Sequence, residues 1–166
     1  MMANQQWLDE RESRAWRNYL SAHAKLLARV NRQLQLDSKL SGADYEVLVN
    51  LSEAPDLRMR SFELITSMEW EKSRLSHHLT RMEQRGLIER VGCPTDARGA
   101  FIVLTEQGQA AIASAAPLHV VEVRQSFIDA LSPAQLNSLA DISAALLDHF
   151  DHLDRLDRLD RLDCGR

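Results

Sequence analysis

The chain has 166 residues, of which 45% are hydrophobic, and a formal net charge of -4 at pH 7. This length fits one sizeable hydrophobic core, and no continuous apolar run approaches the roughly 20 residues that cross a bilayer. No apolar segment with a cleavage site follows the first methionine, and two cysteines, Cys93 and Cys164, do not make a disulfide framework. These features predict a cytoplasmic protein that does not enter a membrane. The negative charge argues against a generic nucleic-acid binder.

The first predicted element is a long amphipathic helix over residues 10–36. Asp9 and Glu12 are spaced to form a capping box at its start. One small core cannot cover a helix of this length, so we expect its far end to be buried against a second subunit. A looser capping box at 41–44 opens a second helix, which ends at Ala54-Pro55.

Residues 57–105 carry the pattern on which the interpretation depends. Their periodicity predicts a short helix over 61–67, a tight connection and a longer helix over 72–85. Two β-rich runs at 87–91 and 100–104 then predict a hairpin. This order of elements is that of a winged helix-turn-helix, and the fold class is mainly α with a small β-hairpin wing (α+β).

The longer helix has two chemically different sides. Leu75, Leu79 and Met82 fall at i, i+4 and i+7 and form an apolar stripe that faces a core. The opposite side, with its flanks, carries short hydrogen-bonding side chains and cations: Ser73, Arg74, Ser76, His77, Thr80, Arg81 and Gln84, and a further cation, Lys72, stands at the start of the helix. A helix that contacts base edges in a major groove needs such side chains. An isolated helix with this face would be interpreted as solvated, but its position between a short helix and a hairpin favours DNA recognition.

The predicted hairpin connection, residues 92–99, has glycine at both ends and Pro94 within it. Its tip carries Asp96 and Arg98. An arginine on a protruding tip can enter a minor groove, and a carboxylate two residues away can orient its guanidinium. A solvated charged turn is the alternative interpretation.

After the hairpin, Thr105 is predicted to cap a helix that runs to about Leu131, with a kink or break at Pro117. Residues 132–135 supply a cap, a first-turn proline and a box partner for the last helix. From Leu153 to Asp163 the chain repeats Leu-Asp-Arg, which fits either a frayed helical extension or a disordered tail.

Charge is unevenly distributed along the chain. Residues 58–98 hold eight basic and six acidic residues, a net charge of +2, whereas the whole chain has -4. A weakly basic DNA-binding region on an acidic protein predicts binding that depends on specific contacts and weakens as salt rises.

Four stretches resemble the MarR family of bacterial transcriptional regulators. They are Trp70-Glu-Lys-Ser-Arg-Leu-Ser-His-His-Leu79, Arg81-Met-Glu-Gln-Arg-Gly-Leu-Ile88, Asp96-Ala-Arg-Gly99 and Val103-Leu-Thr-Glu-Gln-Gly108. Two positions depart from the family pattern: Glu69 stands where a glycine is usual, and Glu71 stands where a serine cap is usual. Carboxylates at these two positions would repel the phosphates of DNA. Either operator affinity is modest, or the two side chains turn away from the DNA.

The resemblance implies a domain organisation. Residues 1–36 and 106–153 would form a helical dimerisation domain, 37–105 the winged helix-turn-helix domain, and 154–166 the Leu-Asp-Arg tail. It also implies a homodimeric repressor that binds a pseudo-palindrome in double-stranded DNA, with Lys72 at the start of the helix that enters the major groove.

Members of this family often bind small aromatic or anionic effectors in a cleft between the two domains. Five residues are candidates to line such a cleft: Trp16, Tyr19, His23, Tyr45 and His119. The alternative is that these aromatic side chains, which recur at helical spacing, belong to the core.

Other chemistry is not favoured. His149 and His152, with neighbouring aspartates, could begin a metal site, but a solvated helix face is preferred. Nothing obvious activates Cys93, and we find no nucleophilic triad or phosphate loop, so we expect no enzyme, no metal and no cofactor. Two alternatives stay open: a dimeric winged-helix interaction module without operator binding, and a relative of enzymes that dimerise through a winged helix.

Overall fold

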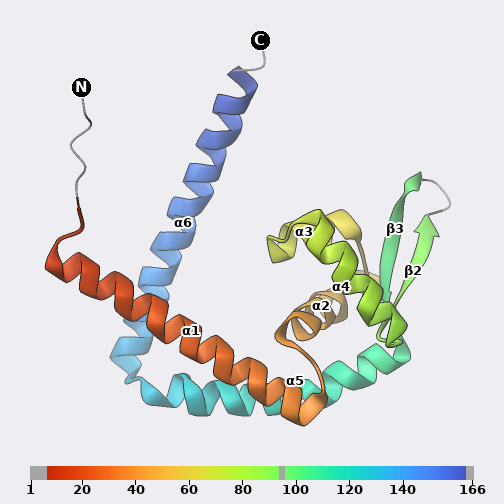
Figure 1. Ribbon diagram of the computed structural model, residues 1–166, viewed down its shortest axis with the longest axis horizontal. Coiled ribbons are helices and arrows are strands. Elements are labelled where there is room, and N and C mark those ends of the chain that lie inside the picture. Colours follow the sequence, from red (N-terminus) through yellow and green to blue (C-terminus); the bar gives the residue numbers. More distant parts are fainter. Residues whose placement is uncertain (1–6, 94–95, 164–166) are drawn as a thin grey trace. The chain divides into compact units, whose positions relative to one another are not determined.

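The computed structural model describes residues 7–93 and 96–163, and within these the side chains of residues 93, 96–99 and 157–163 are outside the description. The chain divides into two compact units, one up to Val123 and one from Arg124 onward. In Figure 1 the first unit includes a lobe of α2, α3 and α4, from which the hairpin of β2 and β3 projects. Among the described helices, none has the length and apolar character required to cross a membrane.

The two N-terminal helices begin at the capping boxes that the sequence predicts. Helix α1 spans Glu10–Ser38, and the Asp9 carboxylate accepts a hydrogen bond of 2.8 Å from the backbone N–H of Glu12. Helix α2 spans Gly42–Glu53 and has the same reciprocal pair between Ser41 and Asp44. Both caps satisfy N–H groups that the first turn of a helix leaves unpaired.

A short 3₁₀ turn, η1 (Pro55–Leu57), leads to the helix-turn-helix, in which α3 spans Ser61–Met68 and α4 spans Lys72–Gln84. The predicted apolar stripe of α4 is confirmed, since Leu75, Leu79 and Met82 are at most 2% exposed. Between the helices, Glu69 adopts a left-handed conformation with φ of 51°. This conformation explains why a glycine is favoured there.

The sheet is larger than the predicted hairpin. Strands β1 (Arg58–Arg60), β2 (Ile88–Cys93) and β3 (Asp96–Leu104) pair antiparallel in the order β1-β3-β2. The expected connection over 92–99 was wrong in its bounds, because strand pairing continues to Cys93 opposite Asp96. Strand β1 was missed, because a three-residue Arg-Met-Arg segment has no strand pattern of its own and is fixed by pairing with Val103, Ile102 and Phe101.

Helix α5 spans Glu106–Ser126 and is followed by a 3₁₀ turn, η2 (Ile128–Ala130). Thr105 caps it as predicted, because its hydroxyl accepts from the Gly108 N–H at 3.0 Å. The helix ends five residues before the predicted Leu131, and Pro117 lies within it without a break. A proline removes a single backbone hydrogen bond, which the remaining turns of this helix accommodate.

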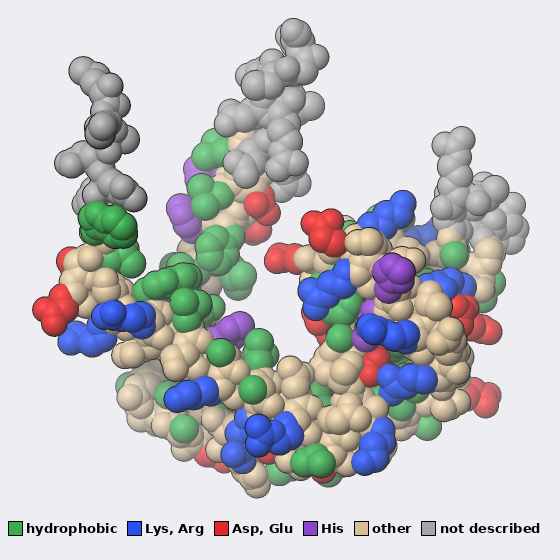
Figure 2. Space-filling model, viewed as in Figure 1, with side chains coloured by type: hydrophobic (Ala, Val, Ile, Leu, Met, Phe, Trp, Pro, Cys, Tyr) green, Lys and Arg blue, Asp and Glu red, His purple; other side chains and the backbone are tan. Residues whose placement is uncertain are grey.

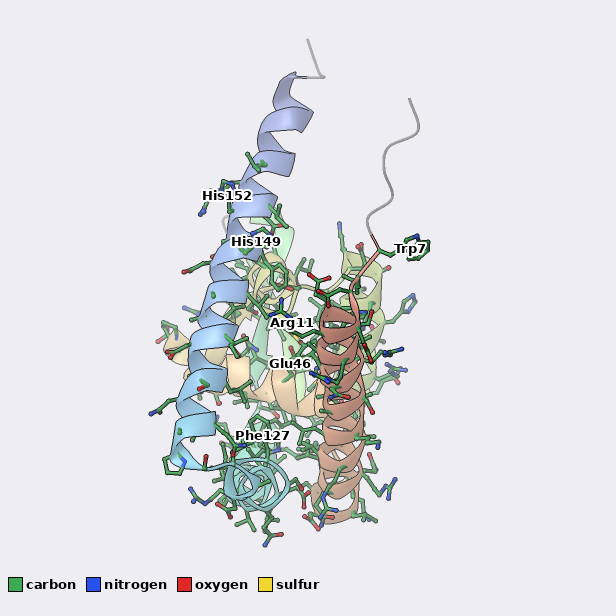
Figure 3. All side chains as sticks on the ribbon, turned by 90° about the vertical axis from the view of Figure 1, so that its left-hand side faces the viewer. Trp7, Arg11, Glu46, Phe127, His149 and His152 are labelled. Carbon is green, nitrogen blue, oxygen red and sulfur yellow. The ribbon has the colours of Figure 1, made fainter. Side chains whose placement is uncertain are left out.

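Helix α6 spans Pro133–Asp163 and begins at the predicted box, in which the Ser132 N–H donates to Oε1 of Gln135 at 2.9 Å. Of the two alternatives for the Leu-Asp-Arg repeat, the helical one holds through Asp163. Figure 3 shows His149 and His152 on the surface of this helix. Both side chains are exposed, in agreement with a solvated face.

The hydrophobic core lies in the first unit and joins α2, α3, α4, the sheet and the start of α5. It is formed by Leu40, Val47, Leu48, Leu51, Leu64, Met68, Trp70, Leu75, Leu79, Met82, Leu87, Ile88, Ile102, Leu104, Ile112 and Ala115. Because the inner side of α4 is buried in this core, its outer side is held at a fixed orientation on the surface.

Candidate nucleic-acid interface

The outer side of α4 is exposed as the sequence predicts. All seven predicted contact residues on this helix are solvent-accessible: Lys72, Ser73, Arg74, Ser76, His77, Thr80 and Arg81. In Figure 2 cationic side chains and a histidine gather over α4, and acidic side chains lie toward the edges of the same lobe. The surface therefore combines hydrogen-bonding groups with positive charge, as recognition of base edges and phosphates requires.

Two of these cations lie against neighbouring aromatic rings of the same lobe. The Arg74 guanidinium stacks on the Trp70 ring at 3.9 Å, and Nη2 of Arg81 lies 3.2 Å from Nδ1 of His78. Such contacts restrict long, flexible side chains and so reduce the entropy that they would lose on binding.

A buried polar cluster behind α4 was missed by the sequence analysis. Asp44 and His78 are only 3% and 6% exposed, and Nε2 of His78 lies 3.2 Å from Oδ1 of Asp44. Arg85 donates to the other Asp44 oxygen at 2.8 Å and to the Lys39 carbonyl at 2.9 Å. One signal was present: His78 lies three residues after Leu75, on the inward side of the helix.

The cluster fixes the charge of Asp44. Burial by itself would raise the pKa of this carboxyl, but hydrogen bonds from His78, Arg85 and Ser41 outweigh it and hold the pKa well below its usual range. A permanent carboxylate therefore joins the start of α2 to the middle and the end of α4.

A groove of about 730 Å³ runs between α3, α4 and the base of the hairpin. It is lined by three cations, one carboxylate, and polar and apolar side chains from these elements, among them Arg60, Glu63, Lys72, Ser76, Leu79 and Arg90. This concave surface, on which cations outnumber carboxylates, lies next to the predicted DNA contacts of α4.

The two predicted wing residues, Asp96 and Arg98, are the first and third residues of strand β3. Their side chains are outside the described part of the structure, so their roles stay predictions. The backbone pairing is irregular between Gly92 and Cys93, which changes the register of the strands toward the tip.

A second cavity, of about 560 Å³, is bounded by α1, α2 and α5 together with Trp70 and Arg74. The structure brings together two of the five predicted effector-binding residues here, since the rings of Tyr45 and His119 are 4.4 Å apart. Both line the cavity.

The other three predicted effector-binding residues form a separate group on α1. The Trp16 and Tyr19 rings are 6.2 Å apart, and those of Tyr19 and His23 are 5.9 Å apart. All three side chains are exposed and are not among the residues that line the second cavity, so their part in ligand binding stays a prediction.

The aromatic pair in this cavity is electrically neutral at pH 7. Burial lowers the pKa of His119, and burial raises the pKa of Tyr45, with Glu53 adding to it. Nδ1 of His119 is buried and has no hydrogen-bond partner among the described residues. The cavity thus offers a polar atom, a phenol and the Arg74 cation around an aromatic lining.

Comparison with known proteins identifies the family. Residues 40–99 match the model of the MarR family. The chain is 41% identical to AbsC, a MarR family transcriptional regulator from Streptomyces coelicolor, with a TM-score of 0.84, over 89% of this chain and 99% of AbsC. This protein belongs to the MarR family.

Two further relatives of this MarR-family chain support the assignment. Sco3205 from Streptomyces coelicolor, a MarR family regulator whose structure is in complex with DNA, is 38% identical with a TM-score of 0.82, covering 87% of this chain and 91% of Sco3205. The transcriptional regulator HosA of Escherichia coli O111:H- is 33% identical over 79 residues. That match covers 48% of this chain and 57% of HosA, so the chain spans little more than half the length of this curated relative.

Proposed function

We propose that this MarR-family protein is a homodimeric transcriptional repressor that binds a pseudo-palindromic operator in double-stranded DNA. The observation that carries the proposal is the exposed outer side of α4, where hydrogen-bonding side chains and cations stand on a helix whose inner side is anchored in the core. Its relative Sco3205, 38% identical, has a structure in complex with DNA. In this proposal α4 is the recognition helix in the major groove, and Arg98 on the hairpin contacts the flanking minor groove.

The proposed homodimer is supported by apolar side chains that the chain leaves exposed on its terminal helices. On α1 these include Trp16, Leu20 and Leu27. Figure 3 also shows Trp7, 80% exposed, pointing away from the start of α1. On α6, Ile142, Leu146, Leu147, Phe150, Leu153 and Leu156 are exposed. Exposed apolar surface of this kind is typical of subunit interfaces.

Footprinting of the DNA next to the gene tests the operator model. We expect protection of two half-sites of inverted sequence whose centres lie about one helical turn, 10–10.5 base pairs, apart or a multiple of this spacing. Transcription of the adjacent gene should rise when the protein is deleted. A single protected half-site would contradict the dimeric model, and a fall in transcription would contradict repression.

The proposal includes an aromatic or anionic effector in the cavity formed by α1, α2 and α5. Supporting features are the Tyr45–His119 pair, the unpartnered Nδ1 of His119 and the Arg74 cation. Because Arg74 lies both on this cavity and on the recognition helix, a bound carboxylate would draw it away from DNA.

A hydroxybenzoate is a suitable probe, because it combines a ring, a carboxylate and a phenol. Binding of this probe should change the fluorescence of Trp70. His119→Leu should lower the affinity for the probe about tenfold, because one hydrogen bond is lost. Trp7→Phe is the control, since Trp7 is 80% exposed and is neither a lining residue of the cavity nor a predicted effector-binding residue. Trp16→Phe, Tyr19→Phe and His23→Leu then test the three remaining predicted residues. Unchanged binding in His119→Leu would remove this cavity from the account.

A further inference from the structure

Arg90, on strand β2, makes an unusual set of contacts with the recognition helix. Its Nη1 donates to Oε2 of Glu83 at 2.7 Å, and its backbone N–H donates to Oε1 of the same carboxylate at 3.2 Å. Its Nη2 donates to the Ser76 carbonyl at 3.1 Å and to the Thr80 hydroxyl at 3.2 Å. One side chain thus holds three positions that span two turns of α4.

These contacts join the two parts of the molecule that the proposed function assigns to DNA. Ser76 and Thr80 are predicted major-groove contacts, and Arg90 belongs to the hairpin that carries Arg98. The guanidinium is 30% exposed and its charge is balanced by Glu83. Arg90 is therefore placed to fix the helix relative to the hairpin and has little free charge for a phosphate.

The geometry makes the position of the end of strand β2 sensitive to the contacts between Arg90 and α4. Three residues of extended strand separate Arg90 from the end of β2, about 10 Å at 3.3 Å per residue. A rotation of β2 by about 10° about Arg90 would move the end of the strand by ~2 Å. A displacement of this size is enough to lose a groove contact, since hydrogen bonds tolerate only a few tenths of an ångström.

We propose that Arg90 is a positioning residue that sets the angle between the recognition helix and the wing, with Glu83 as its anchor. This inference rests on the proposed DNA-binding function. Arg90 acts through Ser76, Thr80 and the hairpin, not through a contact of its own with DNA.

The competing account is that Arg90 binds a phosphate directly. The two accounts predict opposite results for Glu83→Gln. If Arg90 contacts phosphate, loss of the neighbouring carboxylate frees the cation and removes a repulsive charge, so affinity rises. If Arg90 is a positioning residue, loss of its anchor weakens binding.

The experiment measures operator affinity by fluorescence anisotropy over a salt series for the full-length protein and its Glu83→Gln and Arg90→Gln variants. We expect each single variant to bind the operator about tenfold more weakly than wild type. The double variant should bind as tightly as either single variant, because both substitutions remove the same contact between Arg90 and Glu83. The slope of log affinity against log salt should stay at the wild-type value, whereas loss of one phosphate contact would reduce it by about one. Glu89→Gln, which makes the same change in charge on the exposed side of β2, is the matched control and should not weaken binding.

A second readout separates positioning from a general loss of fold. In the wild-type background Arg98→Ala should weaken binding, but in Arg90→Gln it should cost little more, because the wing is already displaced. If circular dichroism shows that Arg90→Gln is unfolded, the affinity of Glu83→Gln alone decides between positioning and phosphate binding. Tighter binding by Glu83→Gln, or a reduced salt slope in Arg90→Gln, would overturn the inference. Absence of operator preference in the wild-type protein would instead overturn the proposed function.

Discussion

At the scale of single residues, Asp44 has the clearest energetic role. It is 3% exposed, completes the capping box of α2 by accepting from the Ser41 N–H, and lies within 3.2 Å of His78 and 2.8 Å of Arg85. A carboxylate that accepts several hydrogen bonds in a buried site contributes more to stability than an exposed ion pair. This residue connects the corner between α1 and α2 to the recognition helix.

Asp44→Asn should lower the free energy of unfolding by about 2 kcal/mol at pH 7, because hydrogen bonds to a charged group are worth ~1.5–3 kcal/mol. The folded-state pKa of Asp44 is depressed, so its contribution is fully present above the unfolded pKa and is lost as pH falls through the folded pKa. The difference in free energy of unfolding between Asp44→Asn and wild type, measured by urea denaturation, should therefore become smaller below about pH 4. Ser41→Ala, which removes the cap hydroxyl and keeps the carboxylate, should cost about 1 kcal/mol with a weaker pH dependence. A pH-independent loss in Asp44→Asn would refute the ionic role.

Glu69 combines strain with charge. Its φ of 51° is unfavourable for a residue with a side chain. Glu69→Gly should raise the free energy of unfolding by about 0.5–1 kcal/mol, as measured by thermal denaturation. Glu69→Gln keeps the strain and removes the charge, so its stability should be that of wild type while its operator affinity increases. A less stable glycine variant would show that the left-handed conformation is not a source of strain.

At the scale of elements, the sequence predicted those features that depend on local chemistry. Helix α4 was predictable because Leu75, Leu79 and Met82 mark its inner side, and the starts of α1, α2 and α6 were predictable from their capping boxes. Strand β1 was not, because only pairing with β3 makes Arg58–Arg60 extended. The contacts of His78 with Asp44 and of Arg90 with Glu83 were also missed, since they join separate elements.

The wing carries a prediction of its own. Arg98→Ala should weaken operator binding about tenfold while the dimer remains intact, because a minor-groove arginine contributes to DNA binding and not to the subunit interface. Mobility shift and light scattering on the same sample measure the two effects. Arg58 on β1, whose guanidinium lies 4.9 Å from the centroid of the Phe101 ring in β3, provides a control through Arg58→Lys. Unchanged affinity in Arg98→Ala would exclude the wing from recognition.

At the scale of the whole molecule, a pseudo-palindromic operator requires two copies of α4 held at a fixed separation. Exposed apolar residues on α1 and α6 provide surface for such an assembly. Each copy contributes its own DNA contacts, so a variant that does not dimerise should also lose operator affinity.

Leu146→Glu, which places a charge within the apolar stripe of α6, should shift the protein toward the mass of one chain in light scattering and strongly reduce operator affinity. His152→Glu lies on the other side of the same helix and is the control, with wild-type mass and affinity expected. A dimer that persists in Leu146→Glu would place the interface elsewhere.

The central claim is specific recognition of DNA, and competitive mobility shift tests it most directly. The protein is mixed with DNA carrying the intergenic region upstream of its own gene, over a salt series, with unrelated DNA as competitor. We predict a complex that survives excess competitor and tightens as salt falls, since both base contacts and phosphate contacts contribute. Equal displacement by specific and unrelated DNA at every salt concentration would contradict operator recognition at this site and favour an interaction module without an operator.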